Sequence, residues 1–232
     1  MADGTGRLLL TVSGIIPDGL ERDVEIGRRP RPDYVVLASA LEADLVDFVA
    51  ARQSCGFIGR FIERIAGPAV LLAWYCYRHR RQHPIVFTDS EGVGLPYAAL
   101  TWFSRRRPRH VMIGHRLSAR KKVIIQHLLQ LRRRVDDVIV YSTAQREFAA
   151  DRLRYRQRQV HLTPFMVDTS FWQPTVSAAA TADRAKICAV GQELRDYPTL
   201  MDAVRTLDVD VVVAAASPWS KRDDTSAGLA IP

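Results

Sequence analysis

Cysteine is scarce in this sequence of 232 residues, and no long apolar run is present. The three cysteines, Cys55, Cys76 and Cys188, lie far apart and lack the close spacing of zinc ligands. This argues against a disulfide framework and fits a reducing cytoplasm. The longest apolar run, residues 67–77, is far shorter than the roughly 20 residues that a membrane span needs. The N-terminus also lacks the charged leader and apolar run of a signal peptide. We therefore expect a cytoplasmic protein.

Lysine is scarce as well, because arginine supplies 29 of the 33 basic residues, including runs at 105–107 and 132–134. The net charge is +8, with +10 in residues 1–175 and −2 in residues 176–232. One explanation is a GC-rich genome that places arginine on solvated faces. The other is attraction to a polyanion, such as acidic lipid headgroups, lipid phosphates or nucleic acid. The sequence has no nucleic-acid-binding motif, so no nucleic-acid partner is expected. Peripheral contact with an anionic membrane is an alternative that the charge allows.

Short apolar runs alternate with helix-like segments, which is typical of an α/β protein with a parallel sheet. We expect strands at residues 7–13, 34–38, 84–88, 110–113, 137–141, 160–163, 186–190 and 209–216. We expect helices at 41–52, 97–103, 119–131 and 143–152, a helix pair at 58–81 that is broken at Gly67 and Pro68, and a helix from about Pro198. The apolar residues expected to form the inner face of the helix at 119–131 are Ile124, Ile125, Leu128, Leu129 and Leu131.

Two of the expected strands are followed closely by polar residues. Asp89, Ser90 and Glu91 come directly after one strand, and His115 comes just after the next. Ligands of open parallel sheets bind outside the carboxyl ends of the strands. Both loops are therefore candidate parts of a binding site, although a histidine in such a loop is also compatible with a structural or surface role.

Residues 160–174 join the two differently charged parts of the chain. A short β-type run ends at Pro164, an aromatic pair follows at Phe171 and Trp172, and Pro174 ends the segment. Proline donates no ladder hydrogen bond and restricts the residue before it. Two interpretations follow from the residues: a strand end with a surface loop, or a crossover between two α/β units.

The segments TPFMVDTSFWQP (163–174) and AVGQELRDYPTLMDAV (189–204) resemble parts of the family 4 glycosyltransferases, which have the GT-B fold. Supporting segments are DSEGVGLPYA (89–98), IGHRLSARKK (113–122) and VIVYSTAQREF (138–148). The resemblance favours the crossover and implies two Rossmann-like domains that face each other across a cleft. It implies a complete N-terminal, acceptor-side domain at 1–164, with a parallel sheet and helices on both faces. A crossover at 165–184 and a partial C-terminal, nucleotide-sugar-binding domain at 185–232 would follow.

The resemblance also implies a function: transfer of a sugar from a nucleotide-diphospho-sugar donor to a glycan or lipid-linked acceptor, with retained configuration, in polysaccharide biosynthesis. It implies no bound metal and no cofactor beyond the donor substrate. His115 matches a loop histidine that the family places near the transferred sugar. Gly191 and Arg195 match the first C-terminal βα loop, which approaches the donor diphosphate. The residues expected to line the acceptor pocket are Asp89, Ser90 and Glu91.

A pair of glutamates seven residues apart, which the family carries in its C-terminal domain, has no match in this sequence. Glu193 is the only glutamate after residue 147. Residues 176–232 are also far fewer than the roughly 150 of a full Rossmann-like half. We therefore expect a truncated or split glycosyltransferase. The alternative is a non-catalytic remnant, or an acceptor-binding module that needs a second polypeptide.

Overall fold

The computed structural model describes residues 8–173, 184–191 and 195–214. The chain divides into two compact units, Met1–Gln173 (unit 1) and Pro174–Pro232 (unit 2). The boundary between them falls within the segment 165–184, which was expected to be a crossover.

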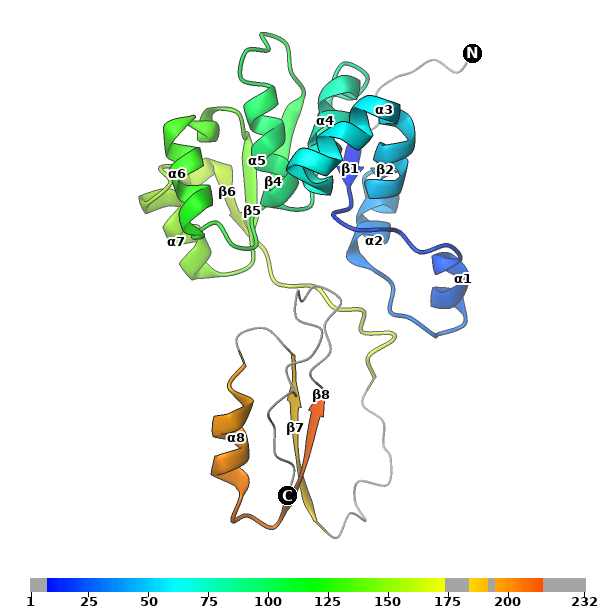
Figure 1. Cartoon of the computed structure of the whole chain (residues 1–232), viewed down its shortest axis with the longest axis vertical. Helices are drawn as coiled ribbons and strands as arrows, with labels where there is room; N and C mark the ends of the chain where they lie inside the picture. Colours follow the sequence, from blue (N-terminus) through cyan, green and yellow to red (C-terminus); the bar gives the residue numbers. More distant parts are fainter. Residues whose placement is uncertain (1–7, 174–183, 192–194, 215–232) are drawn as a thin grey trace. The chain divides into compact units, whose positions relative to one another are not determined.

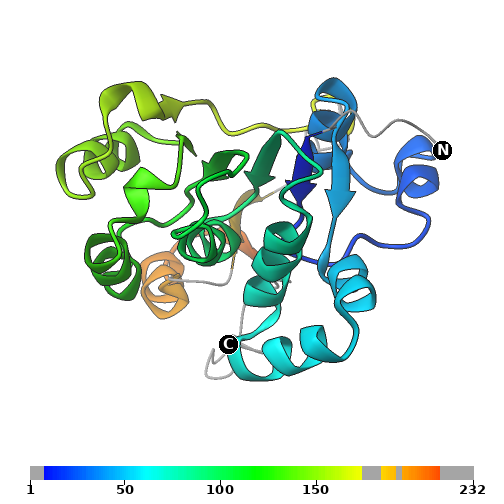
Figure 2. The ribbon, with the colours of Figure 1, turned by 90° about the horizontal axis from the view of Figure 1, so that it is seen from above.

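Unit 1 is built around a six-stranded parallel sheet with the strand order β2-β1-β3-β4-β5-β6 (Figure 1). Its strands are β1 (Leu9–Thr11), β2 (Asp44–Val46), β3 (Ile85–Thr88), β4 (Arg109–Ile113), β5 (Asp137–Val140) and β6 (Val160–Leu162). Helices lie on both faces of the sheet (Figure 2). They are α1 (Leu20–Glu25), α2 (Asp33–Ala40), α3 (Phe48–Ala66), α4 (Pro68–His79), α5 (Glu91–Leu100), α6 (Arg120–Leu128) and α7 (Thr143–Asp151), with 3-10 turns η1 (Leu131–Arg133) and η2 (Gln157–Gln159). The expected α/β class and the parallel sheet with helices on both faces are confirmed, and this arrangement is compatible with a Rossmann-like fold.

The two faces of the sheet carry separate apolar clusters, because successive strand residues point to opposite faces. Leu9 of β1 aligns with Val86 of β3, and both belong to a cluster with residues of α3 and α4. Leu10 aligns with Phe87, and both belong to a cluster with Leu37 of α2. Strands that are buried on both faces have continuous apolar sequences, which is why these strands could be found from the sequence.

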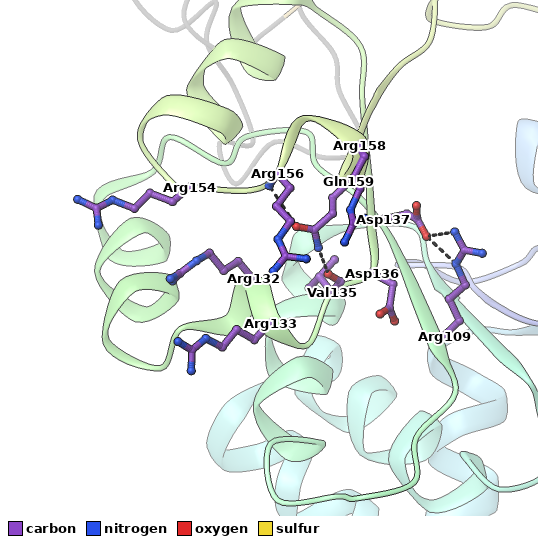
Figure 3. A pocket seen from close by; sticks show the side chains of 10 residues that line it. All are labelled: Arg109, Arg132, Arg133, Val135, Asp136, Asp137, Arg154, Arg156, Arg158 and Gln159. Atoms are coloured by element: carbon purple, nitrogen blue, oxygen red, sulfur yellow. Dashed lines mark hydrogen bonds and ion pairs between the residues drawn. The ribbon is translucent and has the colours of Figure 1, made fainter.

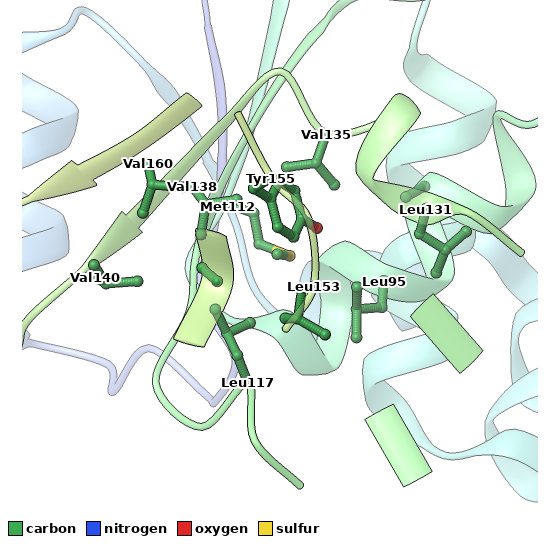
Figure 4. Close-up of a cluster of buried hydrophobic side chains, with 12 residues drawn as sticks. Leu95, Met112, Leu117, Leu131, Val135, Val138, Val140, Leu153, Tyr155 and Val160 are labelled. Carbon is green, nitrogen blue, oxygen red and sulfur yellow. The ribbon is translucent and has the colours of Figure 1, made fainter. Parts of the chain in front are cut away.

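A third cluster fills the other end of unit 1 (Figure 4). Leu95 of α5, Met112 of β4, Leu131 of η1 and Tyr155 all belong to it. The Tyr155 hydroxyl donates to Oε1 of Gln126 on α6 at 3.1 Å. This hydrogen bond provides a partner for the hydroxyl inside an apolar environment.

The prediction of a strand at 34–38 is wrong, and the helix predicted at 41–52 is present only from Phe48, where α3 begins. Residues Asp33–Ala40 form helix α2, and strand β2 follows and pairs with β1. Periodicity alone does not separate a short apolar run in a strand from one in a helix. In α2, Tyr34, Leu37 and Ala38 have helical spacing and pack on one face of the sheet. Asp47 then begins α3 by accepting the Ala50 N–H at 2.8 Å.

The expected helix at 97–103 begins earlier than predicted, at Glu91, and contains Pro96. Ser90 is extended, and its carbonyl accepts the Gly94 N–H at 2.9 Å. The first turn therefore forms before the proline is reached, and the proline removes a single intrahelical donor. By contrast, the expected break at Gly67 is confirmed, because this residue has φ +88° and separates α3 from α4.

The inner face predicted for the helix at 119–131 is wrong. Four of the five apolar residues are exposed: Ile124 (63%), Ile125 (46%), Leu128 (78%) and Leu129 (43%). Leu131 is buried, but it lies in η1 beyond the end of α6. The helix instead turns Gln126 toward the core, where it accepts the hydrogen bond from Tyr155. The apolar spacing predicts a helix, but it does not determine which side of the helix meets the protein.

Unit 2 contains two parallel strands, β7 (Ala185–Val190) and β8 (Val209–Ala214), connected through helix α8 (Tyr197–Val204). The Asp196 side chain caps α8 by accepting the Thr199 N–H at 3.1 Å. The strands and helix expected in this part of the sequence are confirmed over the described residues.

A glycine allows helix α5 to pack closely on the sheet. A Cβ atom at Gly94 would lie 2.6 Å from both Met112 Sδ and Thr88 Oγ1, and both of these residues are fully buried. At Gly92, two residues earlier in the same helix, the nearest atom would be Ser90 Oγ at 3.4 Å. Gly94 is therefore required for packing, whereas Gly92 has space for a side chain.

We expect Gly94→Ala to destabilise unit 1 by about 2 kcal/mol, because overpacking a closed core outweighs the helix propensity that alanine adds. Gly92→Ala is the matched control and should be neutral or stabilising by up to about 1 kcal/mol. Urea unfolding of the two variants measures the difference. Equal stability of the two variants would contradict this account of the packing.

A buried histidine supports the centre of the sheet. His110 of β4 is fully buried, with Nδ1 3.3 Å from the Arg134 carbonyl and Nε2 3.1 Å from Thr88 Oγ1. Its ring packs edge-on against Tyr97. Burial lowers the pKa of His110 to about 4. The unfolded chain therefore binds more protons than the folded chain between this value and the ordinary histidine pKa of about 6.5.

It follows that His110 makes the fold less stable as the pH falls from about 6.5 to 4. In His110→Leu, the slope of unfolding free energy against pH should be smaller by up to about 1.4 kcal/mol per pH unit in this window. Urea unfolding at several pH values measures both slopes. An unchanged slope in the variant would show that His110 is not held neutral by burial.

Candidate functional site

The candidate site lies at the carboxyl edge of the unit 1 sheet. Strand β2 pairs with β1 on one side, and β3, the next strand along the chain, pairs with β1 on its other side. The loops after β1 and β3 therefore diverge at a topological switch point, where open parallel sheets bind their ligands. The loops after β4, β5 and β6 continue the same edge.

Asp89 joins the two loops at the switch point. Its Oδ1 accepts the Thr11 hydroxyl at 2.6 Å and the Ser13 hydroxyl at 2.8 Å, and its Oδ2 accepts the Ser13 N–H. Ser13 Oγ also lies 2.7 Å from Ser90 Oγ. Burial raises the pKa of Asp89, although these hydrogen bonds oppose the rise. Both carboxylate oxygens already accept hydrogen bonds from the end of β1 and the loop after it, so Asp89 fixes the position of that loop. The half-buried hydroxyls of Ser13 and Ser90 lie next to this carboxylate.

Glu91 holds the loop after β4. This side chain is 4% exposed. Its Oε2 accepts the His115 N–H at 2.8 Å, and its Oε1 accepts the Arg116 N–H at 3.1 Å and the Lys122 ammonium at 2.6 Å. Burial alone would raise the pKa of Glu91, but the bonds from Lys122 and the His115 amide hold it below its usual value. Glu91 was expected to line an acceptor pocket. In the structure both of its carboxylate oxygens accept hydrogen bonds from the protein itself.

His115 lies at the centre of this arrangement. Its Nε2 is 3.0 Å from the Asp89 carbonyl, which can only accept, so Nε2 carries the proton and donates. The His115 carbonyl accepts from the Gln145 side chain. In the neutral ring Nδ1 is then a hydrogen-bond acceptor, and it has no partner among the described residues. The side chain is exposed.

An aromatic row continues from His115 along the edge of the sheet. Tyr141, after β5, lies with its ring centroid 5.6 Å from that of His115, and Phe165, after β6, lies 5.1 Å from Tyr141. Phe165 is 75% exposed. The segment that carries it is held across the edge by Asp168, which accepts the Arg31 N–H at 2.7 Å. Sequence reasoning missed Tyr141 and Phe165 as site residues, although Tyr141 directly follows β5 and Phe165 lies three residues after the end of β6.

The other two predicted residues belong to unit 2. Gly191 follows β7 with φ +113°, and Nε of Arg195 lies 3.1 Å from the position that a Cβ atom would occupy there. The Arg195 side chain therefore lies against the glycine, and any side chain at residue 191 would meet it. Arg195 is exposed and has no carboxylate partner among the described residues. Glu193 lies outside the described residues.

No three His, Cys, Asp or Glu side chains in the described part of the chain are grouped to hold a metal ion. No helix in the same part is long and apolar enough to cross a membrane. Neither a protein-family model nor a curated protein matches the chain.

Glu91→Gln should destabilise unit 1 by about 2 kcal/mol, because an amide nitrogen would face a buried donor and Lys122 would lose its partner. The amide hydrogen of His115 should also exchange faster with solvent. Urea unfolding and hydrogen exchange measure these two effects.

Lys121→Met is the control for this change, since Lys121 is exposed and has no carboxylate partner among the described residues. It should alter stability by less than about 0.5 kcal/mol. If Glu91→Gln were as stable as the control and its His115 amide equally protected, Glu91 would not hold this loop.

Proposed function

We propose that the chain belongs to a glycosyltransferase, and that the carboxyl edge of unit 1 binds the acceptor. The observation that carries this proposal is the way His115 is held. Its backbone N–H is bound by Glu91, its carbonyl by Gln145 and its Nε2 by the Asp89 carbonyl, while Nδ1 has no partner in the part of the chain that the structure describes. Side chains fixed in this way are preorganised for a ligand.

The chemistry of the edge suits a sugar. The hydroxyls of Ser13 and Ser90 and the open Nδ1 of His115 can exchange hydrogen bonds with ring hydroxyls. The exposed ring of Phe165 and the half-buried ring of Tyr141 offer apolar faces next to these polar groups. Ligand sites commonly combine apolar and aromatic walls with a few polar groups that set orientation.

In the proposed reaction His115 accepts a hydrogen bond from a sugar hydroxyl and orients it, and it forms no covalent intermediate. Asp89 is not the base, since both of its oxygens accept intramolecular hydrogen bonds. The leaving diphosphate of a nucleotide-diphospho-sugar donor would take the acceptor proton in a transfer that retains configuration. The guanidinium of Arg195, which has no carboxylate partner among the described residues, suits contact with that diphosphate, and Gly191 leaves room for this side chain beside the backbone. The acceptor class would be a glycan or a lipid-linked phosphate.

The test incubates the full chain with uridine- and guanosine-diphospho sugars and a mixture of oligosaccharides and membrane lipid extract. We expect acceptor-dependent release of nucleoside diphosphate above a protein-free blank. His115→Ala should reduce this release about tenfold, as expected for one hydrogen bond to the substrate. His127→Ala, at an exposed position on α6, is the matched control and should leave it unchanged.

The absence of release with every donor would contradict the proposed transferase. In that case, binding of the same oligosaccharides or lipids, weakened by His115→Ala, would favour the alternative of a non-catalytic acceptor-binding module. Equal losses in the His115 and His127 variants would remove His115 from the proposed site.

A further inference from the structure

An arginine-lined pocket of about 810 Å³ lies at the opposite, amino-terminal edge of the unit 1 sheet (Figure 3). It is formed where β4 and β5 begin and where η2 leads into β6. The arginines that line it are Arg109, Arg132, Arg133, Arg154, Arg156 and Arg158. Because parallel strands start at this edge, the pocket is separate from the candidate site around His115.

The carboxylates of this pocket are already neutralised. Asp137 accepts from Arg109 at 2.7 Å and lies 2.8 Å from Nε2 of His161. Asp136 accepts two hydrogen bonds from Arg107, which approaches from outside the pocket lining, and one from the His110 N–H. Among the described residues, the other five arginines of the pocket have no carboxylate partner. The pocket therefore keeps five guanidinium groups that neither of its two carboxylates pairs, and its charge is strongly positive.

The backbone that carries these arginines is firmly held. Leu153 and Tyr155 are buried in the third apolar cluster, so the alternating residues Arg154, Arg156 and Arg158 face outward. Gln159 accepts the Arg156 N–H at 3.1 Å and donates to the Val135 carbonyl at 3.0 Å. This side chain connects η2 to the start of β5.

Arg154 stands where a glycine would be favoured. It has φ +60°, in the left-handed region. On either side of it, the Leu153 N–H bonds to the Phe148 carbonyl and the Tyr155 N–H bonds to the Ala149 carbonyl, which ends helix α7. Helix ends of this kind usually have glycine at the left-handed position. An arginine at this position is a strained choice, and strained residues cluster at functional sites.

We propose that this pocket binds a ligand with two or more adjacent phosphate groups, either a soluble oligophosphate or a phosphorylated lipid headgroup. Guanidinium groups bind phosphate oxygens through paired, charge-assisted hydrogen bonds. Several unpaired guanidinium groups around one pocket exceed what a single carboxylate or monophosphate can neutralise. The proposal does not depend on the function proposed for the carboxyl edge.

The test titrates the full chain with tripolyphosphate at 0.15 M salt in a calorimeter. We expect saturable binding that Arg156→Gln/Arg158→Gln weakens at least about tenfold, since charge-assisted hydrogen bonds are lost. Arg60→Gln/Arg64→Gln, at exposed positions on α3, removes the same charge outside the pocket and should change the affinity less than about twofold. A parallel arm measures binding to vesicles with and without phosphatidylinositol 4,5-bisphosphate, whose headgroup carries two adjacent phosphates, and preference for one probe identifies the source of the phosphates.

A second variant, Arg154→Gly, distinguishes a direct loss of phosphate binding from a loss caused by misfolding. It should raise the melting temperature by about 2 °C, because it relieves the left-handed strain, and it should still weaken binding of the favoured probe. Absence of binding to both probes would overturn the proposal, as would equal losses in the two double variants. Tighter binding of a single-stranded DNA oligonucleotide than of either probe, lost in Arg156→Gln/Arg158→Gln, would also overturn it in favour of nucleic acid.

Discussion

The carboxyl edge of unit 1 depends on one buried carboxylate. Glu91 begins helix α5 and accepts hydrogen bonds from two consecutive backbone amides after β4 and from Lys122 of α6. In a nearly closed environment such a charge is tolerated only when it is paired and hydrogen-bonded. Its position in the first turn of a helix also favours the negative charge. The placement of His115 follows from these bonds, because they determine where the loop runs.

Much of the fold could be predicted from the sequence, and the errors have a common cause. The buried strands and the break at Gly67 have local signals, namely continuous apolar runs and a glycine before a proline. The strand predicted at 34–38 is a helix, and α6 exposes Ile124 and Leu128. In both cases the sequence showed which residues are apolar. Tertiary packing decides which of them are buried and in which kind of element, and the local pattern carries no information about that packing.

The candidate site was predicted in part. Residues after strand ends indicated the carboxyl edge of the sheet, and Asp89, Ser90, Glu91 and His115 do lie together there. Their division of roles could not be predicted, because it depends on burial and on partners distant in sequence. The carboxylate oxygens of Asp89 and Glu91 accept hydrogen bonds from the protein, whereas one ring nitrogen of His115 has no partner within the described residues. Likewise, only the structure shows that six of the arginines gather around one pocket at the amino edge of the same sheet.

The central claim is that the carboxyl edge presents Nδ1 of His115 as a free hydrogen-bond acceptor. Long-range proton–nitrogen correlation spectra of the 15N-labelled chain at pH 8 report which ring nitrogen carries the proton. The account predicts that His115 is protonated on Nε2, where it donates to the Asp89 carbonyl. Protonation on Nδ1 would contradict it, because a nitrogen lone pair would then face the carbonyl oxygen and the open position would be a donor.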